Sequence, residues 1–197
     1  MERHIDEHLE CYTMNRIKVG NDISGDVAHT HFTDEFAILV IADGLGNGPE
    51  ANESARVVKE TVAKYPDESL EFWFTESNRQ MIAKRGAAVG IVRIDFQAKQ
   101  LTYCGVGNIR MYMLHNHDEM IYPLPVMGYL SGRKIKMNCQ TYAYESGDTF
   151  YMHSDGILAK SPKACLQQSP TAYDLAKKIE SKIDSADDAT FIAVQLL

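Results

Sequence analysis

The stretch FAILVIADGLGNGPEA, residues 36–51, decides the fold of this chain. Residues 36–42 form a continuous apolar run, as expected for a strand that is buried on both faces. The run stops at Asp43-Gly44, glycines follow at alternate positions, and Pro49 then suits the first turn of a helix. Apolar residues recur from there at helical spacing as far as Tyr65, which predicts a helix of about four turns. The order is therefore strand, tight loop and helix.

The rest of the chain predicts more strands than helices. A second helix follows Pro66-Asp67 and ends near Arg85-Gly86. Strands are predicted at 10–19, 87–94, 100–105, 109–114, 149–153 and 189–196, and a late amphipathic helix at 172–183. Hairpins dominate the middle, which suits a mixed α/β (α+β) fold with antiparallel sheets better than a doubly wound parallel sheet. No linker divides the chain, so we expect one domain over residues 1–197.

Composition excludes two classes of protein. The chain has 197 residues, with 27 acidic against 20 basic side chains and a formal charge of −7. No basic stripe is present to neutralise phosphates, so we expect no nucleic-acid partner. The longest apolar run, Phe36 to Ala42, is far shorter than the ~20 residues of a membrane-spanning helix.

The cysteines and the N-terminus favour a cytoplasmic location. Cys11, Cys104, Cys139 and Cys165 lie far apart without a C-x-x-C pair, so we expect buried free thiols in a reducing compartment. The charged residues 1–8 do not resemble a secretory signal.

Carboxylates recur where apolar strands meet turns. The positions are Asp26, Asp43, Asp155 and the pair Asp187-Asp188. If they converged at one edge of a sheet they would repel one another unless a hard divalent cation such as Mg²⁺ or Mn²⁺ lay among them. A glycine directly after the aspartate would let a backbone carbonyl approach such an ion. Each Asp-Gly pair alone is also compatible with an ordinary turn.

Other motifs give less. The glycine loop lacks the third glycine of a dinucleotide fingerprint, because Pro49 occupies that place, and no P-loop or G-x-S-x-G is present. The helix that starts near Pro49 offers free N–H groups to a phosphate. His29, His31 and His153 lie near the aspartates in sequence, and a packed or solvated histidine is the commoner alternative for each.

Taken together, the motifs resemble a known family. They are Gly25-Asp26, residues 38–51, Gly105-Val106-Gly107-Asn108, Ser154-Asp155-Gly156 and Asp187-Asp188-Ala189-Thr190. In order and spacing they resemble the PP2C-like (PPM/SpoIIE-type), metal-dependent serine/threonine phosphatases of bacteria. The resemblance implies an α-β-β-α sandwich, in which two antiparallel sheets carry helices on their outer faces.

The resemblance also implies the site. Asp43 would bridge two ions, Gly44 would supply its carbonyl, and Asp155 and Asp187 would bind the second ion. Asp26 would bind directly or hold a metal-bound water, so that Asp26, Asp43, Asp155 and Asp187 form the catalytic set. Two Mn²⁺ ions are implied, with Mg²⁺ as the alternative, and water activated between them would attack phosphorus. Relatives often carry histidine where this chain has Leu45 or Asn47, so another group, such as a metal-bound water or His153, must protonate the leaving group.

The length and the loop look most like the stressosome phosphatases of the general stress response. The implied function is dephosphorylation of phosphoserine or phosphothreonine on STAS-domain stressosome proteins by a cytoplasmic, monomeric enzyme. This activity would negatively regulate a sigma-B-type response. Two alternatives stay open: a phosphatase of an anti-sigma-factor antagonist, and a catalytically inactive metal-binding interaction module.

Overall fold

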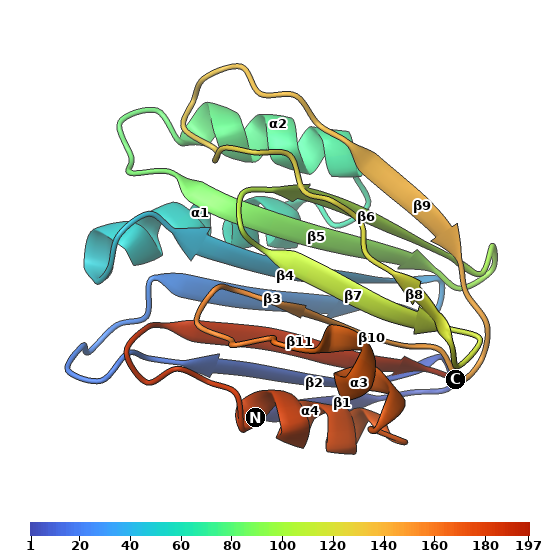
Figure 1. The fold of residues 1–197 in the computed structure, drawn as a ribbon. Coiled ribbons are helices and arrows are strands. Elements are labelled where there is room, and N and C mark those ends of the chain that lie inside the picture. The colour runs from blue at the N-terminus through green and yellow to red at the C-terminus, as the bar shows by residue number, and fades with distance from the viewer.

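Two antiparallel sheets form the centre of the protein, which we describe over residues 1–197 in a computed structural model (Figure 1). The first sheet has the strand order β1-β2-β11-β10-β7-β8 and the second β3-β4-β5-β6-β9. The strands of the first sheet are β1 (Glu2–Ile5), β2 (Leu9–Arg16), β11 (Ala189–Leu196), β10 (Thr149–His153), β7 (Arg110–His115) and β8 (Glu119–Ile121). The strands of the second sheet are β3 (Asp26–Phe32), β4 (Phe36–Gly44), β5 (Ala87–Asp95), β6 (Gln100–Val106) and β9 (Cys139–Ala143).

Helices cover the outer face of each sheet. The helices α1 (Pro49–Lys64) and α2 (Leu70–Gln80) lie on the β3–β9 sheet, and α3 (Pro162–Gln167) and α4 (Ala172–Glu180) lie on the other sheet (Figure 1). The four layers confirm the α-β-β-α sandwich expected from the sequence.

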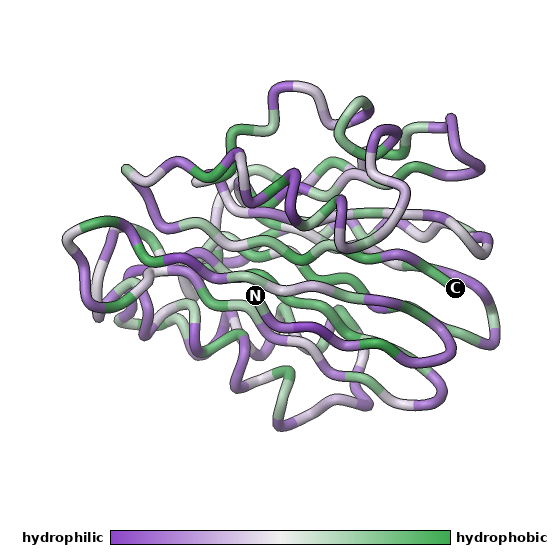
Figure 2. Tube along the Cα trace, turned by 90° about the horizontal axis from the view of Figure 1, so that it is seen from below, coloured by the Kyte–Doolittle hydropathy of each residue, from purple (hydrophilic) through white to green (hydrophobic).

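Three hydrophobic cores fill the spaces between these layers. Leu39, Met111 and Ile192 belong to the core between the two sheets. Val40 and Trp73 belong to the core under α1 and α2, and a third core lies under α3 and α4. Strand β4 contributes alternate side chains to the first and second cores, which explains why its sequence is apolar throughout. In Figure 2 many of the green, hydrophobic segments lie in the middle of the molecule, between the layers.

Most differences from the predicted elements lie at edges and ends. The predicted strand 10–19 is β2, Leu9–Arg16, and the second predicted helix ends at Gln80. The strands β1, β3, β8 and β9 and the short helix α3 were not predicted. Of the cysteines, all of them free, Cys139 is exposed and only the other three are buried. No helix is both long and apolar enough to cross a membrane.

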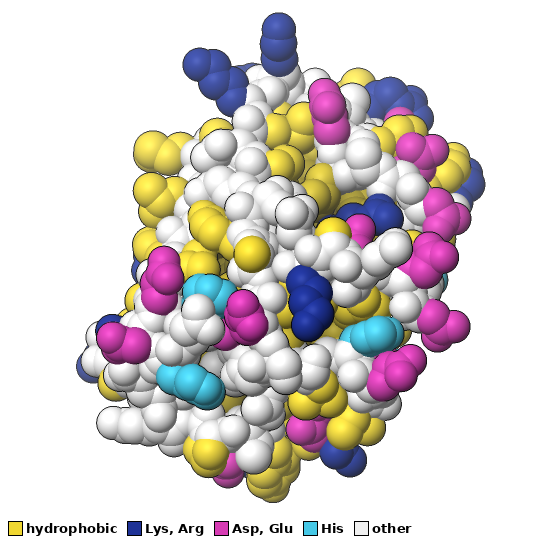
Figure 3. Space-filling model, turned by 90° about the vertical axis from the view of Figure 1, so that its right-hand side faces the viewer, with side chains coloured by type: hydrophobic (Ala, Val, Ile, Leu, Met, Phe, Trp, Pro, Cys, Tyr) yellow, Lys and Arg dark blue, Asp and Glu magenta, His cyan; other side chains and the backbone are white.

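The two ends of the sandwich differ. The turns after β3, β5 and β7 lie at the end remote from Asp43, and exposed acidic side chains surround that end (Figure 3). They include Asp34, Glu35, Asp95, Asp118 and Glu145. The acidic surplus of the chain is therefore spread over both ends of the sandwich and is not confined to the end that holds Asp43.

Candidate metal centre

The aspartates singled out from the sequence lie at one end of the sandwich. Antiparallel pairing of β3 with β4 sets Asp26 directly opposite Asp43 in the second sheet. In the first sheet β10 pairs with β11, so that Asp155 follows one strand and Asp187-Asp188 precedes its neighbour. Each sheet therefore contributes carboxylates to the same end.

Asp26 is the most firmly held of these side chains. It is only 3% exposed, and its Oδ2 atom accepts a hydrogen bond of 2.6 Å from the Ser154 hydroxyl. Ser154 Oγ in turn accepts the backbone N–H of Thr190 at 2.9 Å. Asn15 donates from Nδ2 to the Asp26 carbonyl at 2.9 Å and to the Thr190 hydroxyl at 3.0 Å. These bonds join β2, β3 and β11 across the gap between the sheets.

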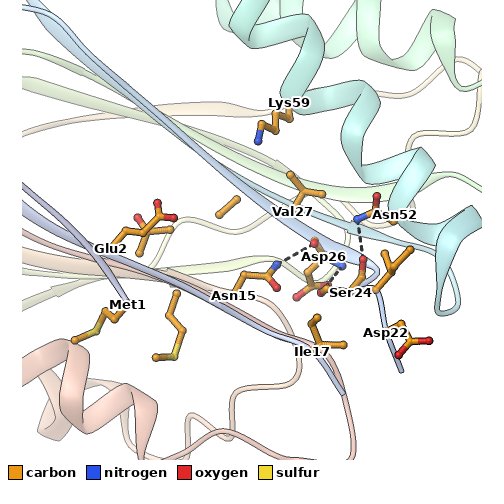
Figure 4. Close-up of a pocket in the computed structure, with 14 residues that line it drawn as sticks. Met1, Glu2, Asn15, Ile17, Asp22, Ser24, Asp26, Val27, Asn52 and Lys59 are labelled. Atoms are coloured by element: carbon orange, nitrogen blue, oxygen red, sulfur yellow. Dashed lines mark hydrogen bonds between the residues drawn. The ribbon is translucent and has the colours of Figure 1, made fainter. Parts of the chain in front are cut away.

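A cavity of about 520 Å³ opens beside this network. Figure 4 shows Asp26 and Asn15 at its floor and Lys59 of α1 reaching in from above, with Asn52 bonded to the Ser24 carbonyl at 2.8 Å. Solvent and small ligands thus have a route to the Asp26 side of the candidate centre.

Asp43 has the most perturbed carboxyl group. Burial first, and then the negative charges of Asp26 and Asp155, together raise its pKa from 3.8 to about 8. Burial likewise raises the pKa of Asp26 to about 6, although the hydroxyls of Ser154 and Thr190 oppose the change. The pKa of Asp155 is raised by burial and then by the charge of Asp187. Carboxylates that repel in this way share protons unless a cation compensates them.

These side chains fit a hard divalent cation by their chemistry. All the donors are oxygen atoms, which Mg²⁺ and Mn²⁺ prefer. Asn108 supports the arrangement, because its Nδ2 donates to Asp155 Oδ2 at 2.7 Å and its amide also lowers the pKa of Asp43. No three acidic or histidine side chains already meet as a ready-made ligand cluster.

The glycines after Asp43 and Asp155 have a packing role as well. A Cβ atom on Gly44 would lie 1.8 Å from the Ala51 carbonyl oxygen, and one on Gly156 would lie 2.1 Å from the Asp188 carbonyl oxygen. Only glycine therefore lets α1 start directly against the end of β4, and the turn after β10 pass against Asp188. The sequence pattern indicated access for a carbonyl, whereas the structure adds this steric reason.

Asp187 and Asp188 differ in environment. Asp187 is exposed, whereas Asp188 is 5% exposed and its carboxylate accepts the backbone N–H groups of Gly25 at 2.7 Å and Lys18 at 2.8 Å. Asp188 thus holds the loop that leads to Asp26 in place, which is a structural role. Asp187 remains available to a ligand.

His153 does not suit the role of general acid. Its Nδ1 lies 2.7 Å from the Ser154 carbonyl, which only accepts, so Nδ1 carries the proton. Burial lowers the pKa of His153 to about 4. The ring is therefore neutral at pH 7 and Nε2 has no proton to donate.

Sequence reasoning missed the positioning residues Asn15, Ser154 and Thr190. Ser154 and Thr190 lie inside two of the quoted motifs, so the motifs held a signal for them. Asn15 gave one weaker sign, a polar residue within a predicted strand.

Comparison with known proteins identifies the family. The family profile described as "Stage II sporulation protein E (SpoIIE)" matches residues 33–197. The phosphoserine phosphatase RsbX of Bacillus subtilis (strain 168) is 36% identical over 191 residues, which is 96% of each chain. The chain belongs to the SpoIIE family.

Solved structures agree with this assignment. A crystal structure of RsbX in complex with magnesium superposes with a TM-score of 0.96 at 34% identity, covering 100% of this chain and 99% of that one. A chain from a study of the bacterial stressosome gives a TM-score of 0.87 at 28% identity, covering 96% of this chain and all of that one. The PP2C phosphatase domain of Bacillus subtilis SpoIIE, at 15% identity and a TM-score of 0.76, shares the fold over 95% of this chain and 63% of that one. This SpoIIE-family chain thus has the PP2C phosphatase fold.

Proposed function

We propose that this SpoIIE-family chain is a metal-dependent phosphoserine/phosphothreonine protein phosphatase. Its substrates would be phosphorylated STAS-domain proteins of a stressosome, and its action would lower a sigma-B-type stress response. The enzyme would work as a cytoplasmic monomer. The identity of 36% over nearly the whole length to a phosphoserine phosphatase supports the reaction, and the likeness to a chain from a study of the bacterial stressosome supports the partners.

One observation carries the chemical part of the proposal. Burial and the charges of Asp26 and Asp155 raise the pKa of Asp43 to about 8, which marks a place where negative charge lacks compensation. In the proposed centre Asp43 would bridge two Mn²⁺ or Mg²⁺ ions and the Gly44 carbonyl would bind one of them. Asp155 and Asp187 would bind the other ion, and Asp26 would bind directly or through water. Ions bound there would activate water and offset charge on the phosphoryl oxygens.

The chain's own residues then have defined tasks. Ser154 fixes Asp26 through its 2.6 Å hydrogen bond, and Asn108 fixes Asp155 at 2.7 Å. Leu45 offers no proton, and the neutral His153 ring offers none at Nε2, so a metal-bound water or another residue would have to protonate the leaving serine or threonine oxygen.

The test is release of phosphate from a phosphoserine STAS-domain protein. We expect turnover with Mn²⁺, loss of turnover with excess chelator, and loss of at least ~10³-fold in Asp43→Asn. The control variant Asp67→Asn changes an exposed loop carboxylate and should retain wild-type turnover. Turnover that survives both chelation and Asp43→Asn contradicts the metal centre. Absence of turnover under every condition favours the interaction module.

A further inference from the structure

A second, smaller cavity lies directly beside the proposed metal centre. It measures about 280 Å³ and is lined by Asn108, Arg110, His153, Asp155 and residues 157–160. Asn108 and Asp155 therefore belong both to this cavity and to the proposed centre. The volume lies just below the roughly 300–1,000 Å³ of sites for drug-sized ligands. It suits a side chain of a protein substrate better than a cofactor.

Two cations line this cavity without forming a salt bridge, and Asp155 is the one carboxylate in the lining beside them. Arg110, at the start of β7, and Lys160, in the loop after β10, are both exposed. Neither forms one of the salt bridges of the structure, although acidic residues outnumber basic ones in the chain. Residues 157–159 add apolar side chains to the lining. Such a site attracts an anion carried on a partly apolar stem.

His153 supplies a third, independent feature. The residue is 3% exposed, and its Nε2 atom is buried without a hydrogen-bond partner. In the neutral tautomer that fits the 2.7 Å contact between Nδ1 and the Ser154 carbonyl, Nε2 is a hydrogen-bond acceptor. Tyr112 and Tyr151 stack beside the ring at centroid distances of 5.9 and 5.6 Å and keep it in place. A buried acceptor without a partner is costly, and a ligand that brings a donor removes that cost.

We propose that this cavity binds an acidic side chain that lies within two residues of the phosphoserine in the protein substrate. Arg110 and Lys160 hold the carboxylate, and His153 Nε2 accepts an N–H of the substrate main chain. Extended peptide advances ~3.3 Å per residue, so a neighbour of the phosphoserine reaches a cavity that shares Asp155 with the centre. This inference rests on the proposed phosphatase function and names its substrate class.

The alternative occupant, the phosphoryl group itself, fits less well. A fully ionised phosphate offers only acceptor oxygens, so it leaves the Nε2 acceptor of His153 unpaired. An acidic peptide offers both the anion for the two cations and an N–H for Nε2.

Phosphoserine peptides of equal length test the proposal on the full chain with Mn²⁺. One peptide has glutamates around the phosphoserine and the other has alanines, and the measured quantity is the ratio of their kcat/KM values. We expect a wild-type ratio of about 10 or more in favour of glutamate. In Arg110→Met the ratio falls about tenfold, and in Lys160→Met roughly threefold, because an ammonium group lacks the bidentate hydrogen bonding of a guanidinium group. Lys64→Met, an exposed cation in the last turn of α1, should keep the wild-type ratio.

Several outcomes overturn the proposal. A wild-type ratio near 1 does so directly. An equal loss of kcat/KM in Arg110→Met on both peptides and on p-nitrophenyl phosphate also overturns it, because that result assigns the arginine to the phosphoryl group.

Failure of the phosphatase function itself is distinguishable. If the wild type hydrolyses no phosphoserine substrate, binding of fluorescein-labelled forms of the same peptides is followed by anisotropy. Weaker binding of the glutamate peptide, but not of the alanine peptide, to Arg110→Met still supports the acidic subsite. Equal binding of both peptides to wild type and variant refutes it.

Discussion

Replacing Asp43 by asparagine should make the metal-free protein more stable while it disables the enzyme. Burial and the charges of Asp26 and Asp155 raise the pKa of Asp43 to about 8. The ionised carboxylate is therefore costly in the folded chain when no cation is present. Asparagine has nearly the same shape and carries no charge, so it removes that cost.

The size and sign of the effect follow from proton linkage. Between pH 3.8 and about 8 the native Asp43 keeps a proton that the unfolded chain has lost, so wild-type stability falls as pH rises through this window. At ~1.4 kcal/mol for each pKa unit, the full difference is roughly 6 kcal/mol. Asp26 shares the interaction, so we expect the variant to gain about 3 kcal/mol at pH 8.5, or ~6–12 °C in Tm. The gain should be about half as large at pH 6.

Thermal and urea unfolding of chelator-treated protein measures this gain at pH 6 and pH 8.5. Asp67→Asn, an exposed carboxylate, should stay within ~0.5 kcal/mol of wild type at both values. With Mn²⁺ at about a hundredfold its dissociation constant, the wild type should recover ~3 kcal/mol and the Asp43→Asn variant much less. A metal-free variant that is no more stable than wild type, or whose gain does not depend on pH, refutes the reasoning.

Three further substitutions probe the scaffold of the site. Gly44→Ala places a Cβ atom 1.8 Å from the Ala51 carbonyl oxygen, so it should cost about 3 kcal/mol in urea unfolding; an unchanged midpoint would show that α1 moves freely. Ser154→Ala removes the donor to Asp26 and the acceptor of the Thr190 N–H, so it should lower the free energy of unfolding by ~2–3 kcal/mol. It should also lower the affinity for Mn²⁺ measured by calorimetry, and wild-type affinity would contradict the positioning role. Asp188→Ala removes the acceptor of two backbone N–H groups and should lower the free energy of unfolding by ~2 kcal/mol. Amide hydrogen exchange at Gly25 should become faster, and unchanged exchange would contradict this role of Asp188.

The central strand and first helix were predictable because their signals are local. Residues 36–42 pack against cores on both faces, so each of them is apolar, and Pro49 marks the helix start. Strand β3 was missed because it is an edge strand whose side chains are mostly half-buried and include His29 and His31. The charged strand β1 and the six-residue helix α3 have equally weak patterns, because pairing and packing with distant elements decide them.

The candidate site was predictable as a set of aspartates and not as a network. Strand ends in the sequence pointed to Asp26, Asp43, Asp155 and Asp187. The hydrogen bond from Ser154 to Asp26 spans 128 residues, and the one from the Gly25 N–H to Asp188 spans 163. Such partners follow from the pairing of the sheets, which single-chain patterns do not encode. The same reason separates Asp187 from Asp188, which are adjacent in sequence but differ in burial.

The most direct test of the metal centre is an anomalous diffraction map of crystals soaked in Mn²⁺. We predict two peaks at the end of the sandwich that holds Asp43, with that carboxylate between them, the Gly44 carbonyl on one and Asp155 and Asp187 on the other. Both peaks should vanish or fall to one in Asp43→Asn crystals. Manganese bound elsewhere, or no ordered peak in wild-type crystals that hydrolyse phosphoserine protein in solution, would contradict the account.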